Sequence, residues 1–405
     1  MQKITAGKTS ELRWTELSGD IMEDKALVVI PEIDFKGGGE RVSYKAAQKL
    51  AEEDVSVDIL TNVFFTGKEN VEEVLYDTYG HSEQFESNLE DIHTIESSRV
   101  KKFVRAKYKE AFQWARASEL HDENSYDYIF THYSNIHFMP EFEGAEVIYY
   151  LGPGPENDPG LKRKILEAGY LTPYWLANRF VGRNPPEKYS FVVNSRFSRE
   201  KFSERFPEID FRVVYPPVDT ESFQYGGEEK ENMIVNFSRI SPDKRNNLLI
   251  EVADELSQEL EDYRFKIVGA VRGSEEGYLE ALREDIEERG LEDMVDIEAN
   301  VSFQELTQTL KKSMVNLHLA KGESFGMTPV ESLAAGNNLV VHRSGAPWKD
   351  IVKEGKYGEG WEDKEELVQK TLELADKESS QQNVERANDF SEEKFKSEIE
   401  SLFDL

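Results

Sequence analysis

The chain has 405 residues, of which 38% are hydrophobic and 11% aromatic, and it contains no cysteine. This length exceeds one ordinary core and suits two domains of about 200 residues each. The lack of cysteine excludes disulfides and thiolate metal sites. No run approaches the ~20 apolar residues of a membrane span, and residues 1–20 are polar, without the apolar segment of a signal peptide. We therefore expect a cytosolic (cytoplasmic) protein, with peripheral attachment to the cytosolic membrane face left open.

Charge sets this chain apart. Lysine and arginine number 49 and aspartate and glutamate 80, so the net charge is −31 at pH 7. Acidic runs such as EEDVSVD and EDKEEL follow amphipathic patterns, and we interpret them as solvated faces. Dense surface carboxylates suit a halophilic protein, because high salt screens their mutual repulsion. A basic partner is the alternative. Binding to nucleic acid would need basic stripes, and the sequence contains none.

The first half of the chain alternates strand-like and helix-like patterns. We predict strands at residues 25–34, 55–63, 126–132, 146–151, 190–195 and 211–217. We predict helices after the glycine triplet at 37–39 and near residues 97–120 and 159–180, and a short helix after the strand at 190–195. Residues 66–95 are acidic, bear aromatic side chains and are only weakly periodic, so we interpret them as an insertion.

The second half repeats this alternation after a polar, glycine-containing stretch at 218–232 that is typical of a linker. Strands are predicted at residues 233–240, 264–271, 295–300, 315–320 and 337–342. Helices are predicted near residues 245–261, 275–289, 302–312, 328–335, 363–377 and 381–404. Alternating strands and helices predict parallel sheets covered on both faces. The chain is thus expected to be an α/β protein with two doubly wound domains, whose strand-end loops meet at a cleft.

Basic side chains follow the first strand of the second half, in the segment NFSRISPDKRN. Ser241 can cap a helix, Pro242 suits its first position, and Lys244 falls in its first turn. A helix N-terminus carries partial positive charge and binds anions, so a lysine there is unexpected unless the helix and the lysine bind the same anion. Arg239 would approach the same point, and we interpret the pair as a diphosphate clamp. Two solvated surface cations are the alternative. Further cations at predicted strand ends are Arg245, Lys321 and Arg343.

The triplet Gly37-Gly38-Gly39 after the first strand resembles a phosphate-cradling turn. It lacks a full G-x-G-x-x-G and an acidic ribose ligand, so a dinucleotide-dependent dehydrogenase fits poorly. A tight turn that allows close backbone packing is the structural alternative for the triplet.

Residues 322–336 read GESFGMTPVESLAAG and contain two glutamates. Glu331 fits a capping box with Thr328 as the N-cap, which is a structural role. Glu323 has no such role and stands in the loop after a strand, at the ligand end of the sheet. Carboxylates accept paired hydrogen bonds from sugar diols, and the N–H groups of Gly326 and Met327 can bind phosphate. The stretch therefore predicts recognition of a sugar and a phosphate.

Five motifs carry a resemblance to a known family: E-x₇-E from Glu323 to Glu331, NFSRISPDK, VVYPPVD, VVNSRFS and HRSGAPWKDIV. Over most of residues 25–400 the chain resembles the retaining glycosyltransferases of family 4, which have the GT-B fold of two Rossmann-like domains facing a central cleft. GGGERV and HLAKGESFGMTPVE are most similar to the α-1,2-mannosyltransferases of lipid-linked oligosaccharide assembly. The resemblance implies an acceptor-side domain (1–218), a domain binding the sugar nucleotide (219–380), and a terminal helix (381–405) that packs back on the first.

The resemblance also implies roles for single residues. The implied catalytic residues are His132, Arg239, Lys244 and Glu323. The implied donor-binding residues are Gly38, Gly39, Arg239, Lys244, Glu323, Phe325, Gly326, Met327 and Glu331. The two cations would neutralise the departing diphosphate, Glu323 would contact the transferred sugar, and Glu331 would hold the ribose. His137 lies close to His132 as a second candidate for the catalytic histidine, and the loop with Ser344 and Gly345 is expected to face the cleft.

The implied reaction needs neither a metal nor a cofactor. The D-x-D motif of metal-dependent transferases is absent, and the seven histidines show no metal-ligand spacing. Fixed cations could stabilise the leaving diphosphate instead. We expect a GDP- or UDP-hexose donor, a hydroxyl acceptor on a glycan, a glycolipid or a small molecule, and no nucleic acid. An NDP-sugar epimerase of the same fold and a non-catalytic sugar-nucleotide-binding subunit are the alternatives.

Overall fold

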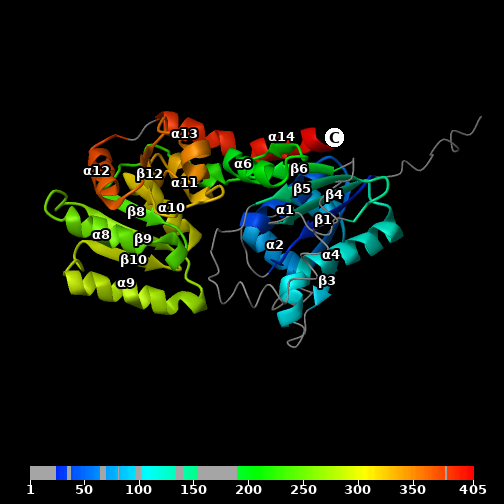
Figure 1. Ribbon diagram of the computed structural model, residues 1–405, viewed down its shortest axis with the longest axis horizontal. Helices are drawn as coiled ribbons and strands as arrows, with labels where there is room; N and C mark the ends of the chain where they lie inside the picture. Colours follow the sequence, from blue (N-terminus) through cyan, green and yellow to red (C-terminus); the bar gives the residue numbers. More distant parts are fainter. Residues whose placement is uncertain are drawn as a thin grey trace, which may run out of the picture.

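The computed structural model of the protein describes residues 24–33, 38–63, 70–80, 82–96, 102–133, 140–152, 189–378 and 381–405. Predictions for Gly37, His137, the helix near 159–180 and residues 1–20 lie outside these ranges. The described strands form two parallel sheets, which confirms the predicted α/β class. Each sheet and the helices packed on it make one lobe, and the two lobes lie side by side (Figure 1).

The sheet of the first lobe contains seven described strands in the order β3-β2-β1-β4-β5-β6-β7, all parallel. These strands are β1 (Lys25–Ile30), β2 (Ser56–Val63), β3 (Leu89–Glu96), β4 (Tyr128–Tyr133), β5 (Glu146–Leu151), β6 (Tyr189–Val193) and β7 (Phe211–Val213). The strand order reverses between β1 and β4. A doubly wound sheet leaves a crevice for ligands at this switch point, beyond the carboxyl ends of its strands.

Helices cover both faces of the first sheet. They are α1 (Gly38–Glu52), α2 (Val71–Tyr79), α3 (Glu83–Asn88), α4 (Lys102–Asn124), α6 (Arg196–Arg205) and α14 (Glu392–Phe403). The first three and α14 share one apolar core that includes Leu50, Phe85 and Ile399. On the opposite face, Trp114 of α4 and Phe202 of α6 belong to a second core. Burial on both faces explains the continuous apolar run of β1.

The interpretation of residues 66–95 as an insertion is wrong for its described part. That part builds α2, α3 and most of β3, and β3 pairs with β2 in the sheet. Val71, Leu75 and Phe85 are buried in the core of the lobe. The sequence of β3, LEDIHTIE, is polar because an edge strand has less to bury and avoids a flat apolar edge. The apolar pattern that reveals central strands is therefore weak here.

The sheet of the second lobe has the order β10-β9-β8-β11-β12-β13, again all parallel. Its strands are β8 (Met233–Phe237), β9 (Arg264–Gly269), β10 (Val295–Ala299), β11 (Val315–His318), β12 (Asn338–His342) and β13 (Glu359–Trp361). Its helices are α7 (Thr220–Phe223), α8 (Asn247–Glu255), α9 (Glu276–Arg289), α10 (Phe303–Lys312), α11 (Met327–Ala334), α12 (Lys364–Ala375) and α13 (Gln381–Ala387). The sequence missed β13, which has only three residues.

The C-terminal segment returns from the second lobe to the first (Figure 1). The predicted single helix 381–404 is α13, the 3₁₀ turn η6 (Asn388–Phe390) and α14. The break has two causes: Phe390 is buried against Tyr215 and Phe325, and Ser391 caps α14 by accepting from the Lys394 N–H. Ser391 also forms a β-bridge with Val218, so the two chain crossings between the lobes lie side by side.

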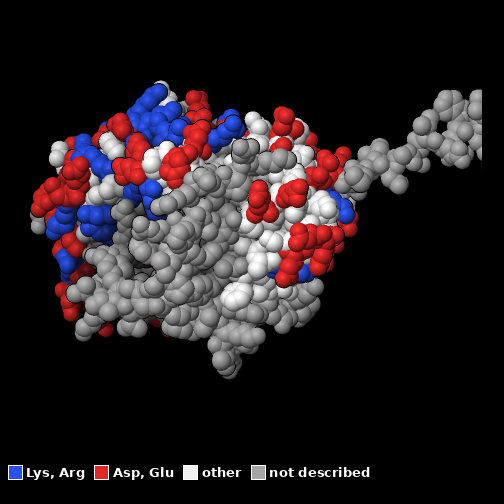
Figure 2. Space-filling model, turned by 45° about the vertical axis from the view of Figure 1, so that its right-hand side comes forward, with Lys and Arg blue, Asp and Glu red and all other residues white. Residues whose placement is uncertain are grey.

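The charge excess lies on the surface. Figure 2 shows Asp and Glu side chains spread over both sides of the face in view, with Lys and Arg gathered mainly on the left-hand side. This distribution agrees with the interpretation of the acidic runs as solvated faces. Within the described ranges, no helix combines the length and the apolar character needed to cross a bilayer.

Candidate active site

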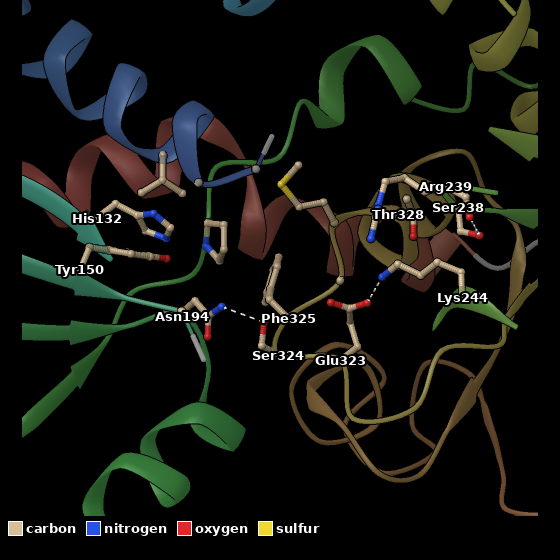
Figure 3. A pocket seen from close by; sticks show the side chains of 17 residues that line it. His132, Tyr150, Asn194, Ser238, Arg239, Lys244, Glu323, Ser324, Phe325 and Thr328 are labelled. Atoms are coloured by element: carbon tan, nitrogen blue, oxygen red, sulfur yellow. Dashed lines mark hydrogen bonds and ion pairs between the residues drawn. The ribbon is translucent and has the colours of Figure 1, made fainter. Parts of the chain in front are cut away.

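A cavity of about 450 Å³ lies between the lobes, at the carboxyl ends of strands from both sheets (Figure 3). The first lobe contributes Gly38, Gly39, Val42, His132, Tyr150, Gly152 and Asn194. The second lobe and the crossing before it contribute Pro216, Ser238, Arg239, Lys244, Glu323, Ser324, Phe325, Gly326, Met327 and Thr328. The fold therefore brings nearly all of the predicted site residues to one cavity, and Glu331 is the exception.

The loop that carries the two cavity cations is fixed by buried amides. Asn246 is fully buried, donates to the side chain of Asn236 at 2.6 Å and accepts from the Ser241 N–H at 3.1 Å. It also donates to Ser238 Oγ at 2.9 Å. A Cβ on Gly269 would lie 1.7 Å from the Ser238 carbonyl oxygen, so only glycine fits beside this loop. The loop is thus held from beneath by strand β8 and from the side by β9.

Arg239 and Lys244 line the cavity, each beside an acidic partner. Arg239 lies 3.2 Å from Asp243, and Lys244 forms an ion pair with Glu323. Pro242–Lys244 form a 3₁₀ turn, and Ser241 precedes it without a side-chain capping bond. The other three predicted cations do not line the cavity: Arg245 lies over Trp361, Arg343 pairs with Glu366, and Lys321 is exposed. A position at a strand end is therefore not enough to predict which cations line the cavity.

Glu323 is the acidic group of the cavity. Burial alone would raise its pKa, but the Lys244 ammonium and the His318 ring outweigh burial and hold the pKa below its usual value. Its carbonyl oxygen accepts from the Ala346 N–H at 2.9 Å. A Cβ on Gly345 would lie 2.8 Å from that same oxygen, so this position needs glycine. The loop with Ser344 and Gly345 was expected to face the cleft; among the described residues it braces Glu323 from behind instead.

The capping box predicted for Glu331 is wrong. Helix α11 begins at Met327, its N-cap is Gly326 at φ +90°, and no side chain caps it. Glu331 is buried one turn into the helix and does not line the cavity. Burial raises its pKa to about 7, with Arg41 lowering it and Asp219 raising it. The positive φ explains the error, because glycine adopts it freely and makes the earlier helix start possible.

His132 is the penultimate residue of strand β4, on the first-lobe side of the cavity (Figure 3). Loss of water around the ring lowers its pKa to about 4, so the imidazole is neutral at pH 7. A Cβ on Gly39 would lie 2.5 Å from the His132 ring, which shows why α1 begins with glycines. The ring also packs against Tyr150, with centroids 5.6 Å apart. The imidazole is thus held against the start of α1, facing the cavity.

Sequence reasoning assigned no role to Asn194, Tyr150 or Ser324, which all line the cavity. Asn194 donates to Ser324 Oγ at 3.2 Å across the lobe boundary. The motif VVNSRFS was noted only as a family match. Its signal is the Ser-x-x-Ser spacing, because Ser195 caps α6 by accepting from the Ser198 N–H.

Residues 217–396 match the sequence profile of the family Glycosyl transferases group 1. The chain carries a glycosyl transferases group 1 domain. This glycosyltransferase domain covers the second lobe and the first part of α14. A GDP-Man:Man(3)GlcNAc(2)-PP-Dol alpha-1,2-mannosyltransferase of Caenorhabditis elegans is 25% identical over 194 residues, which are 45% of this chain and 40% of that protein. Its Mus musculus counterpart is 31% identical over 154 residues, which are 35% of this chain and 31% of that protein.

Solved structures match nearly the whole chain. A glycosyltransferase from Rickettsia africae has a TM-score of 0.66 at 16% identity and covers 94% of this chain and 99% of its own. Anabaena Alr3699/HepE in complex with UDP has a TM-score of 0.64 at 17% identity and covers 95% of this chain and 100% of its own. These neighbours confirm the predicted GT-B fold. The mannosyltransferase relatives are matched over less than half of their own length.

The arrangement has a defined chemical capacity. Two cations and one ionised carboxylate lie on the glycosyltransferase-domain side of the cavity, and uncharged groups lie on the other side. Among the described residues, no three His, Cys, Asp or Glu side chains are grouped so that they could hold a metal ion. The cavity can therefore accept an anion against Arg239 and Lys244 and hydroxyl groups against Glu323.

Proposed function

We propose that the protein is a retaining, metal-independent glycosyltransferase that moves a hexose from a nucleotide-diphosphate sugar to a hydroxyl acceptor. One observation carries the proposal: Arg239, Lys244, Glu323 and His132, from two lobes, line one cavity at the strand ends. The relatives described above are mannosyltransferases, which supports transfer of a hexose.

The leaving group determines the role of the cations. When the bond from the anomeric carbon to the phosphate oxygen breaks, negative charge develops on the diphosphate. Arg239 and Lys244 stabilise this charge from positions that the buried amides fix in advance. Glu323 pairs with the Lys244 ammonium. A bound diphosphate draws that ammonium to its own oxygens and leaves the carboxylate to accept hydrogen bonds from the hexose.

The proton balance supports retention of configuration. An inverting transferase needs a general base near the acceptor hydroxyl. On the first-lobe side, the described lining contains no carboxylate, and a pKa of about 4 makes His132 a poor base. In the proposed step, the acceptor oxygen attacks the anomeric carbon from the side of the departing diphosphate. The acceptor proton then passes to the phosphate oxygen released by the same bond.

The donor base and the acceptor remain proposals drawn from relatives. The names of the related mannosyltransferases include GDP-Man and a lipid-linked glycan, and one solved neighbour, Anabaena Alr3699/HepE, is a complex with UDP-glucose. We propose GDP-mannose or a UDP-hexose as the donor and a glycan, a glycolipid or another hydroxyl compound as the acceptor. Peripheral contact with a membrane would follow from a lipid-linked acceptor.

The test begins with calorimetric binding of GDP and UDP in molar potassium chloride, which identifies the base. Transfer is then measured with the matching hexose donor and a panel of glycan and glycolipid acceptors, with and without EDTA. The anomeric proton coupling in the product gives its configuration. We expect that EDTA does not change the rate of transfer and that the product has the anomeric configuration of the donor.

Other outcomes separate the alternatives. Interconverted sugar nucleotide without any acceptor would indicate an epimerase. Nucleotide binding without turnover over the whole panel would indicate a non-catalytic subunit. An inverted product would disprove retention, and loss of activity with EDTA would disprove metal independence.

A further inference from the structure

The turn between β6 and α6, residues Asn194–Ser198, contacts the second lobe at two separate places. One contact reaches the loop that carries Glu323, and the other reaches Asp350 in the helical turn η5 (Pro347–Ile351). The turn belongs to the first lobe, since β6 pairs with β5. The turn lies in the motif VVNSRFS and Asp350 lies in HRSGAPWKDIV, and the proposed function assigns neither motif a role.

The contact with the Glu323 loop uses both the side chain and the backbone of Ser324. Ser195 Oγ donates to the Ser324 carbonyl oxygen at 2.6 Å. Asn194 Nδ2 donates to Ser324 Oγ at 3.2 Å, the bond that is dashed in Figure 3. Ser198 Oγ donates to Asn194 Oδ1 at 2.5 Å, which fixes which end of the amide faces Ser324. Ser195 and Ser198 are fully buried. The polar groups of this contact are therefore satisfied in one arrangement.

The contact with Asp350 fixes the turn itself. Asp350 is fully buried and accepts from the backbone N–H groups of Arg196 at 2.9 Å and Phe197 at 3.2 Å. It also accepts from the Arg196 side chain at 3.1 Å and from the Tyr215 hydroxyl at 3.0 Å. A carboxylate of the second lobe thus binds the start of a first-lobe helix, where exposed N–H groups favour negative charge.

The loop that carries Glu323 and Ser324 is held from both lobes. The Glu323 backbone is braced from behind within its own lobe, by the Ala346 N–H. Its neighbour Ser324 is held from the front by the other lobe. Separating the lobes would leave the Ser324 carbonyl oxygen and the Asp350 carboxylate without these donors. Water would replace those donors but would not hold Ser324 in one place, so the position of Glu323 depends on contact between the lobes.

We propose that Asn194 and Ser195 are positioning residues that fix Glu323 for the transferred sugar, so that the sugar subsite is complete only when the lobes are in contact. The nucleotide diphosphate binds to the second lobe without needing this contact. This inference rests on the proposed function for its catalytic consequence, and it can be tested separately from that function.

The first test uses no substrate. Hydrogen exchange of the backbone amides in residues 322–330 is compared in the wild type, Asn194→Ala and Ser302→Ala. Ser302 is a matched control, because it caps helix α10 by accepting from the Glu305 N–H and lies outside the cavity lining. We expect exchange in this segment to be roughly tenfold faster in Asn194→Ala only, because one cross-lobe hydrogen bond is lost. Unchanged exchange would overturn the inference whatever the protein catalyses.

The second test uses turnover. Asn194→Ala should lower kcat/KM for the sugar nucleotide by roughly 10- to 30-fold, as expected when a contacting group is misplaced. The affinity for GDP or UDP alone should change by less than about twofold. A general loss of stability would instead weaken nucleotide binding as well as kcat/KM. The double variant Asn194→Ala, Ser324→Ala should lose no more than the larger single loss, because both changes break one hydrogen bond.

The outcomes separate the two proposals. One outcome is fast exchange in Asn194→Ala together with no turnover in any variant, the wild type included. It would support the positioning role and disprove the proposed function. Additive losses in the double variant, or equal weakening of GDP or UDP and sugar-nucleotide binding, would overturn positioning and leave the transferase proposal standing.

Discussion

The two sides of the cavity differ in charge and in how they are built. The second-lobe side presents Arg239, Lys244 and Glu323 on loops braced by buried asparagines and glycines. The first-lobe side presents glycine backbone, a neutral imidazole and an amide. Under the proposed function, the second lobe would stabilise the charge of the leaving diphosphate and the first lobe would align an uncharged acceptor.

Removing the charged side should have the largest effect. Lys244→Ala should lower kcat/KM by about 10²–10³-fold, the scale for loss of one preorganised electrostatic group. The matched control is Lys266→Ala, because Lys266 also pairs with a glutamate, Glu298, and has similar exposure, yet lies away from the cavity. Steady-state kinetics measure both. Equal losses in the two variants would show that the position of Lys244 in the cavity gives it no special role.

A steric change on the uncharged side should have a smaller effect. Gly39→Ala puts a Cβ 2.5 Å from the His132 ring, so the ring or α1 must shift. We expect roughly 10- to 100-fold lower kcat/KM, since small misplacements at a reacting centre are costly. Gly38→Ala is the control, because its Cβ meets only the flexible end of Met327, at 3.4 Å. An active Gly39→Ala enzyme would show that this side needs no precise alignment.

Glu331 tests whether the buried acid below the cavity serves the donor. Glu331→Gln should weaken donor binding by roughly tenfold if the carboxylate accepts from ribose hydroxyls. Its pKa rises from 4.5 to about 7, so the folded protein keeps a proton that the unfolded chain releases. The free energy of unfolding of the wild type should therefore fall as the pH rises from 5 to 8, and that of Glu331→Gln should fall less. Identical pH profiles in chemical denaturation would contradict this burial.

The smallest expected effect concerns His132. Because its pKa lies at about 4, its ring stays neutral from pH 5.5 to 8. In the Glu331→Gln background, kcat/KM should therefore change by less than about twofold over this range. A tenfold drop on acidification to pH 5.5 would show that the imidazole takes up a proton, and the uncharged side of the comparison would fail.

The sequence predicted most of the fold because both sheets are rich in buried central strands with continuous apolar runs. It failed where that signal is weak: the polar edge strand β3 and the three-residue β13. Arg239, Lys244 and Glu323 could be found because each follows a strand. The direction of a side chain was not readable, so Arg343, which turns to Glu366, looked equivalent to Lys244. Contacts across lobes, such as Ser195 with Ser324, depend on how two domains meet, which no local pattern encodes.

The return of α14 to the first lobe has a consequence for dissecting the protein. Phe395, Ile399 and Phe403 complete a core whose other members come from the first 220 residues. A gene fragment that stops at residue 380 would leave an open apolar trough beside α1, and its product should aggregate. Separate expression of the halves needs the C-terminal peptide supplied in trans, or a circular permutation that splices it to the first lobe.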